Sequence, residues 1–134
     1  MKFTRERPDG IYSFHASGDR EVTINSPSPK DPRDQDGRLV LDQSFILRPQ
    51  QLLQNWRPRQ LTELQAEDLD RLETETLEVL LIGTGVRMQL PGREQIALLA
   101  GLGVGYELMD TAAACRTYNI LAAEGRRVAA AIML

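Results

Sequence analysis

Three apolar runs alternate with two helix-like segments in the second half of the chain, and this pattern constrains the fold more than any other sequence feature. The first run, Leu77–Ile82 (LEVLLI), is nearly continuous and is followed by a Gly-Thr-Gly sequence. Such a run suits a strand that is buried on both faces of a sheet. The same reasoning predicts, in chain order, a helix at 93–102, a strand at 104–109, a helix at 110–124 and a strand at 127–134.

The ends of the two predicted helices carry the residues expected there. Asp110 is a suitable N-cap for the second helix, because its carboxylate can accept hydrogen bonds from the free backbone N–H groups of the first turn. Gly103 and Gly125 follow the two helices, where glycine commonly ends a helix. Short connections between alternating strands and helices favour right-handed crossovers, so residues 77–134 are predicted to form a βαβαβ unit with parallel strands.

The first half is richer in proline and in alternating patterns, which indicate strands and loops. Strands are predicted at Ile11–Ala16 and Glu21–Asn25, joined as a hairpin. Ser26–Gly37 has no apolar side chain other than proline, so it has little surface to bury and is predicted to be a mobile loop. Arg38–Leu47 predicts another strand, interrupted at its centre by a bulge or a tight turn, and residues 65–72 predict a short helix.

Together the two halves predict one α/β domain over residues 1–134, since a chain of this length can bury a core of its own. We expect three layers around a central mixed, largely parallel five-stranded sheet. The β-rich N-terminal half contributes part of that sheet, and the βαβαβ unit contributes the rest.

Composition excludes several classes of function. The net charge of −3 argues against binding to nucleic acid or to an anionic membrane surface, since no basic stripe dominates the sequence. A single cysteine cannot form an internal disulfide, which suits a reducing compartment. The N-terminus has no apolar signal segment, and no apolar run reaches the roughly 18 residues of a membrane span. We therefore expect a cytoplasmic protein with no nucleic-acid partner and no membrane insertion.

Polar and glycine residues follow two of the predicted parallel strands. In such sheets ligands bind beyond the carboxyl ends of the strands, and helix N-termini there favour anions. The residues that would line this crevice are Gly83, Thr84, Gly85, Asp110 and Thr111.

The glycines of this crevice also allow a purely structural interpretation. A dinucleotide-binding fingerprint needs a third glycine, but this chain has Met88 at that position. The next helix also begins late, after Pro91 and Gly92. Two glycines can simply provide a sharp exit from a buried strand.

Cysteine and histidine are too few to build a familiar catalytic or metal site. A cysteine nucleophile needs a base, and the sole histidine, His15, lies in the other half of the chain from Cys115. On a helical wheel Cys115 shares a stripe with Tyr118 and Ala122 that faces the sheet, so we expect it to be buried and unreactive. The sequence predicts no catalytic residue, no metal site and no cofactor.

Three further residues are candidates for contact with a partner protein. Arg116 projects opposite the Cys115 stripe, where it meets solvent or a partner, and Asn119 lies at the edge of the stripe. Trp56, next to Arg57 and close to Arg59, is either an exposed anchor for a partner or a core residue, and the core position is slightly favoured.

Several of these segments carry a family resemblance: Ile82–Gly85, Met109–Thr111 and Ala113–Val128. They resemble a family of small uncharacterised bacterial and archaeal domains that includes mitochondrial respiratory complex I assembly factor 3. The likeness is strongest over 77–134. It implies a three-layer fold with a mixed five-stranded sheet, and it implies no established catalytic residue, metal or cofactor.

Two classes of function remain open. The first is a non-enzymatic protein-interaction or assembly factor, whose partner is an assembly factor or a subunit of a multisubunit complex. The alternative is a small-molecule or anion-binding protein, or an enzyme, that uses the crevice at Gly83–Gly85 and Asp110.

Overall fold

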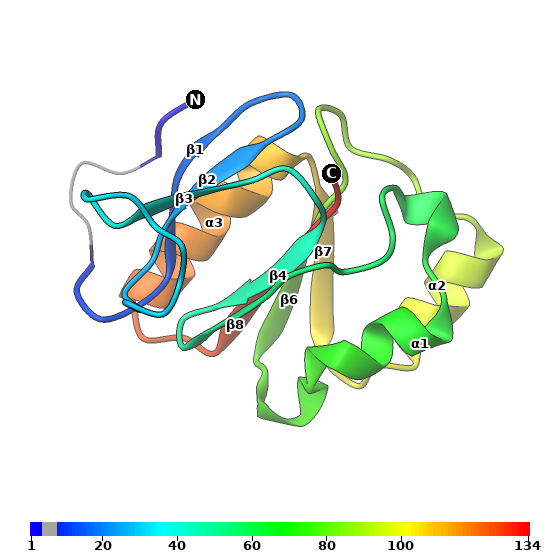
Figure 1. Cartoon of the computed structure of the whole chain (residues 1–134). Coiled ribbons are helices and arrows are strands. Elements are labelled where there is room, and N and C mark those ends of the chain that lie inside the picture. Colours follow the sequence, from blue (N-terminus) through cyan, green and yellow to red (C-terminus); the bar gives the residue numbers. More distant parts are fainter. Residues whose placement is uncertain (4–7) are drawn as a thin grey trace.

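The computed structural model describes residues 1–3 and 8–134, which form two β-sheets flanked by helices (Figure 1). The strands are β1 Ser13–Ser17, β2 Val22–Asn25, β3 Arg38–Leu41, β4 Phe45–Arg48, β5 Gln51–Leu53, β6 Val79–Gly83, β7 Gly105–Met109 and β8 Val128–Ile132. The helices are α1 Ala66–Leu69, α2 Arg93–Ala100 and α3 Thr111–Ala123, with short 3-10 turns η1 Leu61–Glu63, η2 Asp70–Leu72 and η3 Thr74–Thr76.

The larger sheet is mixed, as predicted, with the strand order β5-β4-β8-β6-β7. Strand β6 pairs in parallel with both β7 and β8, and these strands with α2 and α3 form the predicted βαβαβ unit. Strand β4 runs antiparallel to both β8 and β5. Parallel pairing is therefore confined to the β8-β6-β7 part of the sheet, and the N-terminal half supplies the antiparallel part.

Side chains of the central strands alternate between two separate apolar layers. Along β8, Val128 and Ala130 belong to one core cluster, and Ala129 and Ala131 belong to the other. All four are fully buried, which explains why the run is apolar at every position rather than at every second one.

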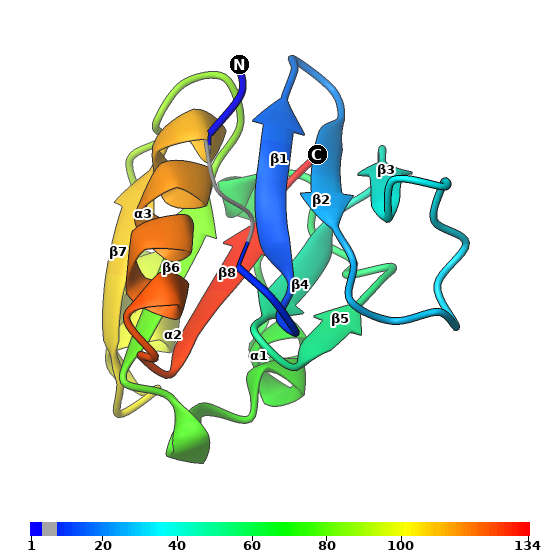
Figure 2. The same ribbon diagram turned by 90° about the vertical axis from the view of Figure 1, so that its left-hand side faces the viewer.

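Different elements cover the two faces of this sheet. Helix α3 and the antiparallel sheet β1-β2-β3 pack on one face, and α1 and α2 pack on the other (Figures 1 and 2). In the first layer the ring of Phe14 meets Tyr118 edge-on, with a centroid distance of 5.1 Å. The Tyr118 hydroxyl donates to the carbonyl oxygen of Tyr12 at 2.9 Å. The expected three-layer architecture is thus present.

The segment predicted as one strand at 38–47 divides between the two sheets. β3 pairs with β2 in the smaller sheet, whereas β4 pairs with β8 in the larger one. Between them lies Ser44, which is 2% exposed and whose Oγ accepts from the Leu134 backbone N–H at 2.9 Å. The predicted interruption is therefore the point at which the chain crosses from one layer to the next.

Polar hydrogen bonds hold the loop that follows β2. The Tyr12 hydroxyl donates to Asp31 Oδ2 at 2.7 Å, and Arg33 Nη1 donates to the carbonyl oxygen of Ser26 at 2.6 Å. Asp34 Oδ1 accepts from the Arg38 backbone N–H at 2.9 Å. These bonds take the place of the apolar anchors that the segment lacks, and its mobility stays a prediction.

Candidate functional site

The residues predicted to line a crevice meet where β6 and β7 end, and Thr84 is at their centre. Its side chain is buried, and its Oγ1 donates to the carbonyl oxygen of Arg87 at 3.0 Å and accepts from the Gln89 backbone N–H at 2.9 Å. The Thr84 backbone N–H donates to the carbonyl oxygen of Met109 at 3.0 Å. Thr84 therefore fixes the start of the next loop against β7.

Gly85, Asp110 and Thr111 form the other half of this arrangement. The Gly85 backbone N–H donates to Thr111 Oγ1 at 3.0 Å, and the Thr111 backbone N–H donates to the Gly85 carbonyl oxygen at 2.8 Å. Asp110 is the N-cap of α3, as predicted, and its Oδ1 accepts from the Ala113 backbone N–H at 2.8 Å. The structure thus gathers the predicted residues, and their side-chain oxygens bond within the protein.

Gly83 is needed for close packing between β6 and α3. A Cβ atom at this position would lie 2.9 Å from Ile132 Cδ1, 3.2 Å from Thr111 Cα and 3.3 Å from Ala114 Cβ. The first turn of α3 cannot move away from the end of β6 without breaking the bonds between Thr111 and Gly85. The absence of a side chain at Gly83 therefore sets the distance between helix and sheet.

The loop between β6 and α2 exposes its apolar side chains and turns one polar side chain, that of Gln89, inward. We call residues 86–90 the apolar loop. Val86, Met88 and Leu90 are 67%, 51% and 80% exposed. Gln89 points the other way, and its Oε1 accepts from the first backbone N–H of η1 at 3.1 Å. The loop is therefore held in place by polar contacts while it presents a row of apolar side chains to solvent.

Two hollows lie at this end of the molecule. A small one, of about 190 Å³, is lined by Gly85, Val86 and Thr111 among others. A larger one, of about 830 Å³, shares Leu134 with it, so the two meet at the end of the chain. Three arginines line the larger hollow: Arg20, Arg57 and Arg59.

The three residues predicted to contact a partner have different environments. Trp56 is 3% exposed, and its Nε1 donates to the carbonyl oxygen of Asp68 at 2.9 Å, so it lies in the core beneath the larger hollow. Asn119 is also buried and bonds to β1. Arg116 alone of the three is exposed, with Nη1 lying 3.2 Å from Met1 Sδ.

Sequence reasoning did not single out the apolar loop or Arg20. A signal for the loop was available, because Val86, Met88 and Leu90 occupy alternate positions between two glycine-containing turns. Arg20 gave no signal, since its neighbours in the larger hollow come from distant parts of the chain.

Cys115 is fully buried on the sheet-facing stripe of α3, as expected, and burial raises the pKa of its thiol above the ordinary value. We predict that a water-soluble disulfide reagent modifies Cys115 in urea within minutes and in the native protein only as fast as the protein unfolds. The release of the reagent's chromophore, followed at mildly alkaline pH with and without urea, checks this. Labelling at the same rate in both conditions would contradict it.

Residues 1–3 and 8–134 contain neither a cluster of metal-ligand side chains nor a membrane-spanning helix. Nowhere in these residues do three histidine, cysteine, aspartate or glutamate side chains gather closely enough to hold a metal ion. None of the helices described there has the length and apolarity needed to cross a bilayer.

Three proteins that are similar to this chain carry names of different kinds. A Xanthomonas campestris protein solved by NMR is 37% identical, with a TM-score of 0.72 over 99% of this chain and 92% of that one. NADH dehydrogenase (ubiquinone) 1 alpha subcomplex assembly factor 3 of Danio rerio is 33% identical over 99 residues, which cover 72% of this chain and 56% of that protein. The 13 kDa major membrane protein of Francisella tularensis subsp. holarctica (strain LVS) is 30% identical over 95 residues, or 71% of this chain and 73% of the relative.

These likenesses extend through both halves of the chain. The chain spans about half the length of the assembly-factor relatives that it matches, 56% in Danio rerio and 47% in Xenopus tropicalis. A family model matches residues 17–133, from the last residue of β1 to the residue after β8. The chain therefore belongs to the family described as "Protein of unknown function (DUF498/DUF598)".

Proposed function

We propose that this protein works by docking another protein, as a non-enzymatic interaction or assembly factor, and that the apolar loop is part of its docking surface. The observation that carries the proposal is the outward row of Val86, Met88 and Leu90 on a loop fixed by inward polar bonds. Apolar side chains that gather on an exposed surface mark sites of protein interaction. Covering them would be favourable by about 1.5–3 kcal/mol for each side chain fully removed from water.

The way the loop is held supports docking with little rearrangement. Thr84 anchors it before Val86, and Gln89 anchors it between Met88 and Leu90, so the apolar side chains are already presented before a partner arrives. A surface that is ordered in advance loses less conformational entropy on binding, and this raises affinity.

Kinship with the Danio rerio protein named as an assembly factor for NADH dehydrogenase points in the same direction. An assembly role for the present chain is part of the proposal, because the chain spans only part of that relative. The partner we propose is accordingly a protein, either an assembly factor or a subunit of a multisubunit complex.

The alternative, binding of a small molecule or anion at the predicted crevice, has less support from the geometry. A free anion needs donors that point outward. Here the Gly85 N–H is already bonded to Thr111 Oγ1, and the Ala113 N–H to Asp110. The adjoining hollow, about 190 Å³, is below the usual size of ligand pockets, about 300–1,000 Å³.

Replacing two side chains of the apolar loop tests the proposal. We predict that a Val86→Ser/Leu90→Ser variant loses at least about nine-tenths of its captured partner, because apolar anchors carry most of the energy of an interface. Its melting temperature should hardly change, because both side chains are largely exposed. The measurement is quantitative mass spectrometry of proteins that co-purify with the tagged chain from its native cells.

Ile120→Ser is the matched control, since Ile120 is 62% exposed but lies on α3. This variant should keep the partner. Equal capture by the loop variant and the unaltered chain would contradict the proposal, as would equal loss in both variants.

A further inference from the structure

We infer that the larger hollow binds an acidic peptide segment of the partner protein; this rests on the proposed docking function and names the chemistry of what is docked. The hollow measures about 830 Å³, which is within the range of about 300–1,000 Å³ typical of ligand sites and is large enough for a few peptide residues. Its wall is built from the β1–β2 turn, the β3–β4 connection and residues 55–59, with Leu134 at one side.

One arginine of the larger hollow is held in position by a buried carboxylate. Arg57 Nε donates to Asp68 Oδ1 at 3.1 Å, and Arg57 Nη2 donates to Asp68 Oδ2 at 2.7 Å. The Asp68 side chain is only 6% exposed and also accepts from the Gln65 backbone N–H at 2.8 Å, so the carboxylate is fixed. This two-point bond orients the guanidinium, whose Nη1 takes no part in it.

The other two arginines have no such partner. Arg20 and Arg59 are exposed, and across residues 1–3 and 8–134 no ion pair joins either of them to Asp42 or to the end of the chain at Leu134. Among the lining residues that lie in the described part of the chain, Asp42 is the one acidic side chain. The Arg57–Asp68 pair is neutral, so the excess of positive charge comes from Arg20 and Arg59 against Asp42, although the whole chain carries a net charge of −3.

Arginine matches carboxylates in particular. Its planar guanidinium can donate two parallel hydrogen bonds to one carboxylate, and it is less strongly hydrated than a lysine ammonium. Two free guanidinium groups beside a third that is fixed would suit a segment with more than one acidic side chain. Aspartate and glutamate residues close together in a peptide provide that chemistry.

The position of the larger hollow beside the apolar loop favours a peptide over a free anion as its ligand. Leu134 lines both hollows, and Val86 of the apolar loop lines the smaller one. The surface is thus continuous from the exposed apolar row to the arginines. A partner that covers the loop can place an acidic segment in the larger hollow without leaving the surface.

An NMR titration of the isotope-labelled protein tests the inference. The probe is a capped peptide with four consecutive glutamates in a Gly-Ser context, and its counterpart has glutamine at those positions. We expect the glutamate peptide to shift the amide signals of Arg20 and of residues 55–59. An Arg20→Glu/Arg59→Glu variant should bind at least about tenfold more weakly, and salt raised to about 300 mM should weaken binding in the unaltered protein.

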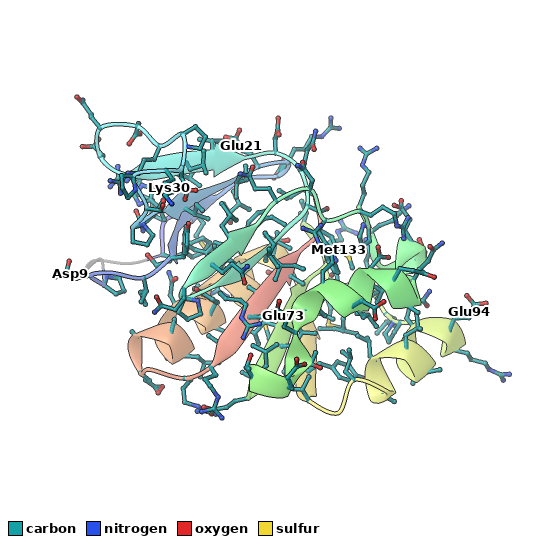
Figure 3. All side chains as sticks on the ribbon, turned by 60° about the horizontal axis from the view of Figure 1, so that its bottom comes forward. Asp9, Glu21, Lys30, Glu73, Glu94 and Met133 are labelled. Atoms are coloured by element: carbon teal, nitrogen blue, oxygen red, sulfur yellow. The ribbon has the colours of Figure 1, made fainter. Side chains whose placement is uncertain are left out.

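Lys30→Glu is the matched control. Lys30 is exposed and lies in the loop after β2, and Figure 3 shows it well apart from Met133, the neighbour of Leu134. This variant should bind within about twofold of the unaltered protein, because only distant, screened charges differ.

Three results would overturn the inference. The first is an unchanged affinity for the glutamate peptide in the Arg20→Glu/Arg59→Glu variant, and the second is equal affinity for the glutamine peptide. The third is displacement of the glutamate peptide by citrate, with citrate alone binding as tightly as the peptide. The last would indicate a site for small carboxylates. The titration uses the isolated chain, and the Val86→Ser/Leu90→Ser variant should bind the peptide with the affinity of the unaltered protein. The outcome of the titration is therefore independent of the co-purification test.

Discussion

Replacing Asn119 with leucine is expected to lower the free energy of unfolding by about 2–6 kcal/mol, because two buried backbone groups lose their partners at about 1–3 kcal/mol each. Asn119 Oδ1 accepts from the Phe14 backbone N–H at 2.8 Å, and Asn119 Nδ2 donates to the Phe14 carbonyl oxygen at 2.9 Å. Asn119 thus completes the hydrogen bonding of β1 from the side of α3. Leucine fills a similar volume and offers neither group.

Urea denaturation followed by circular dichroism measures this loss. Arg116→Leu is the control on the same helix, and it should change the free energy of unfolding by less than about 0.5 kcal/mol because Arg116 is exposed. If Asn119→Leu were as stable as this control, the two bonds to Phe14 would not hold α3 to β1.

Replacing Trp56 with alanine is expected to remove about 3–5 kcal/mol of stability, the usual range for a buried large aromatic residue. The side chain is 3% exposed and belongs to the core layer that also contains Ile46 and Leu99. Its removal also leaves the carbonyl oxygen of Asp68 without the indole N–H. Against a typical total stability of about 5–15 kcal/mol, the variant should be unfolded or close to it at moderate temperature.

Trp56→Phe separates the two contributions. It restores most of the packing but not the hydrogen bond to Asp68, so its stability should lie between those of the alanine variant and the unaltered chain. Because Trp56 is the sole tryptophan, circular dichroism rather than fluorescence must follow unfolding. An alanine variant with an unchanged melting temperature would instead support Trp56 as an exposed anchor.

The elements of the second half could be predicted because their signals are local. The continuous apolar run of β6, the N-cap Asp110 and the helical stripe that contains Cys115 are each complete within a few neighbouring residues. Periodicity and capping act over that range, so they indicate these elements without any knowledge of the sheet.

Features that depend on distant contacts could not be predicted in the same way. The separation of β3 from β4 depends on their pairing with different strands, β2 and β8, and Ser44 between them bonds to Leu134, 90 positions later. Strand β5 is only three residues long and is defined by its pairing with β4. The role of Asn119 likewise depends on Phe14, 105 positions earlier, so the wheel could place Asn119 at an edge but could not name its partner.

The same difference between local signals and distant contacts separates the candidate site residues. The predicted crevice residues lie together, because parallel strands must end at the same edge of the sheet, and their role as a binding site stays a prediction. What those residues do was harder to foresee, since Thr84 bonds to Arg87 and Gln89 and so fixes the exposed loop. The arginine-lined hollow is assembled from three separated segments, and the order of residues along the chain carries no sign of it.

Site-specific photo-crosslinking in native cells tests the central claim, docking through the apolar loop, most directly. A photoreactive amino acid replaces Met88 in one variant and Ile120 in another, both exposed positions on different elements. Docking through the loop predicts a discrete adduct with one other protein from position 88, its loss when Leu90→Ser is added, and no such adduct from position 120. An adduct only with a second copy of the chain, or equal adducts from both positions, would contradict the claim.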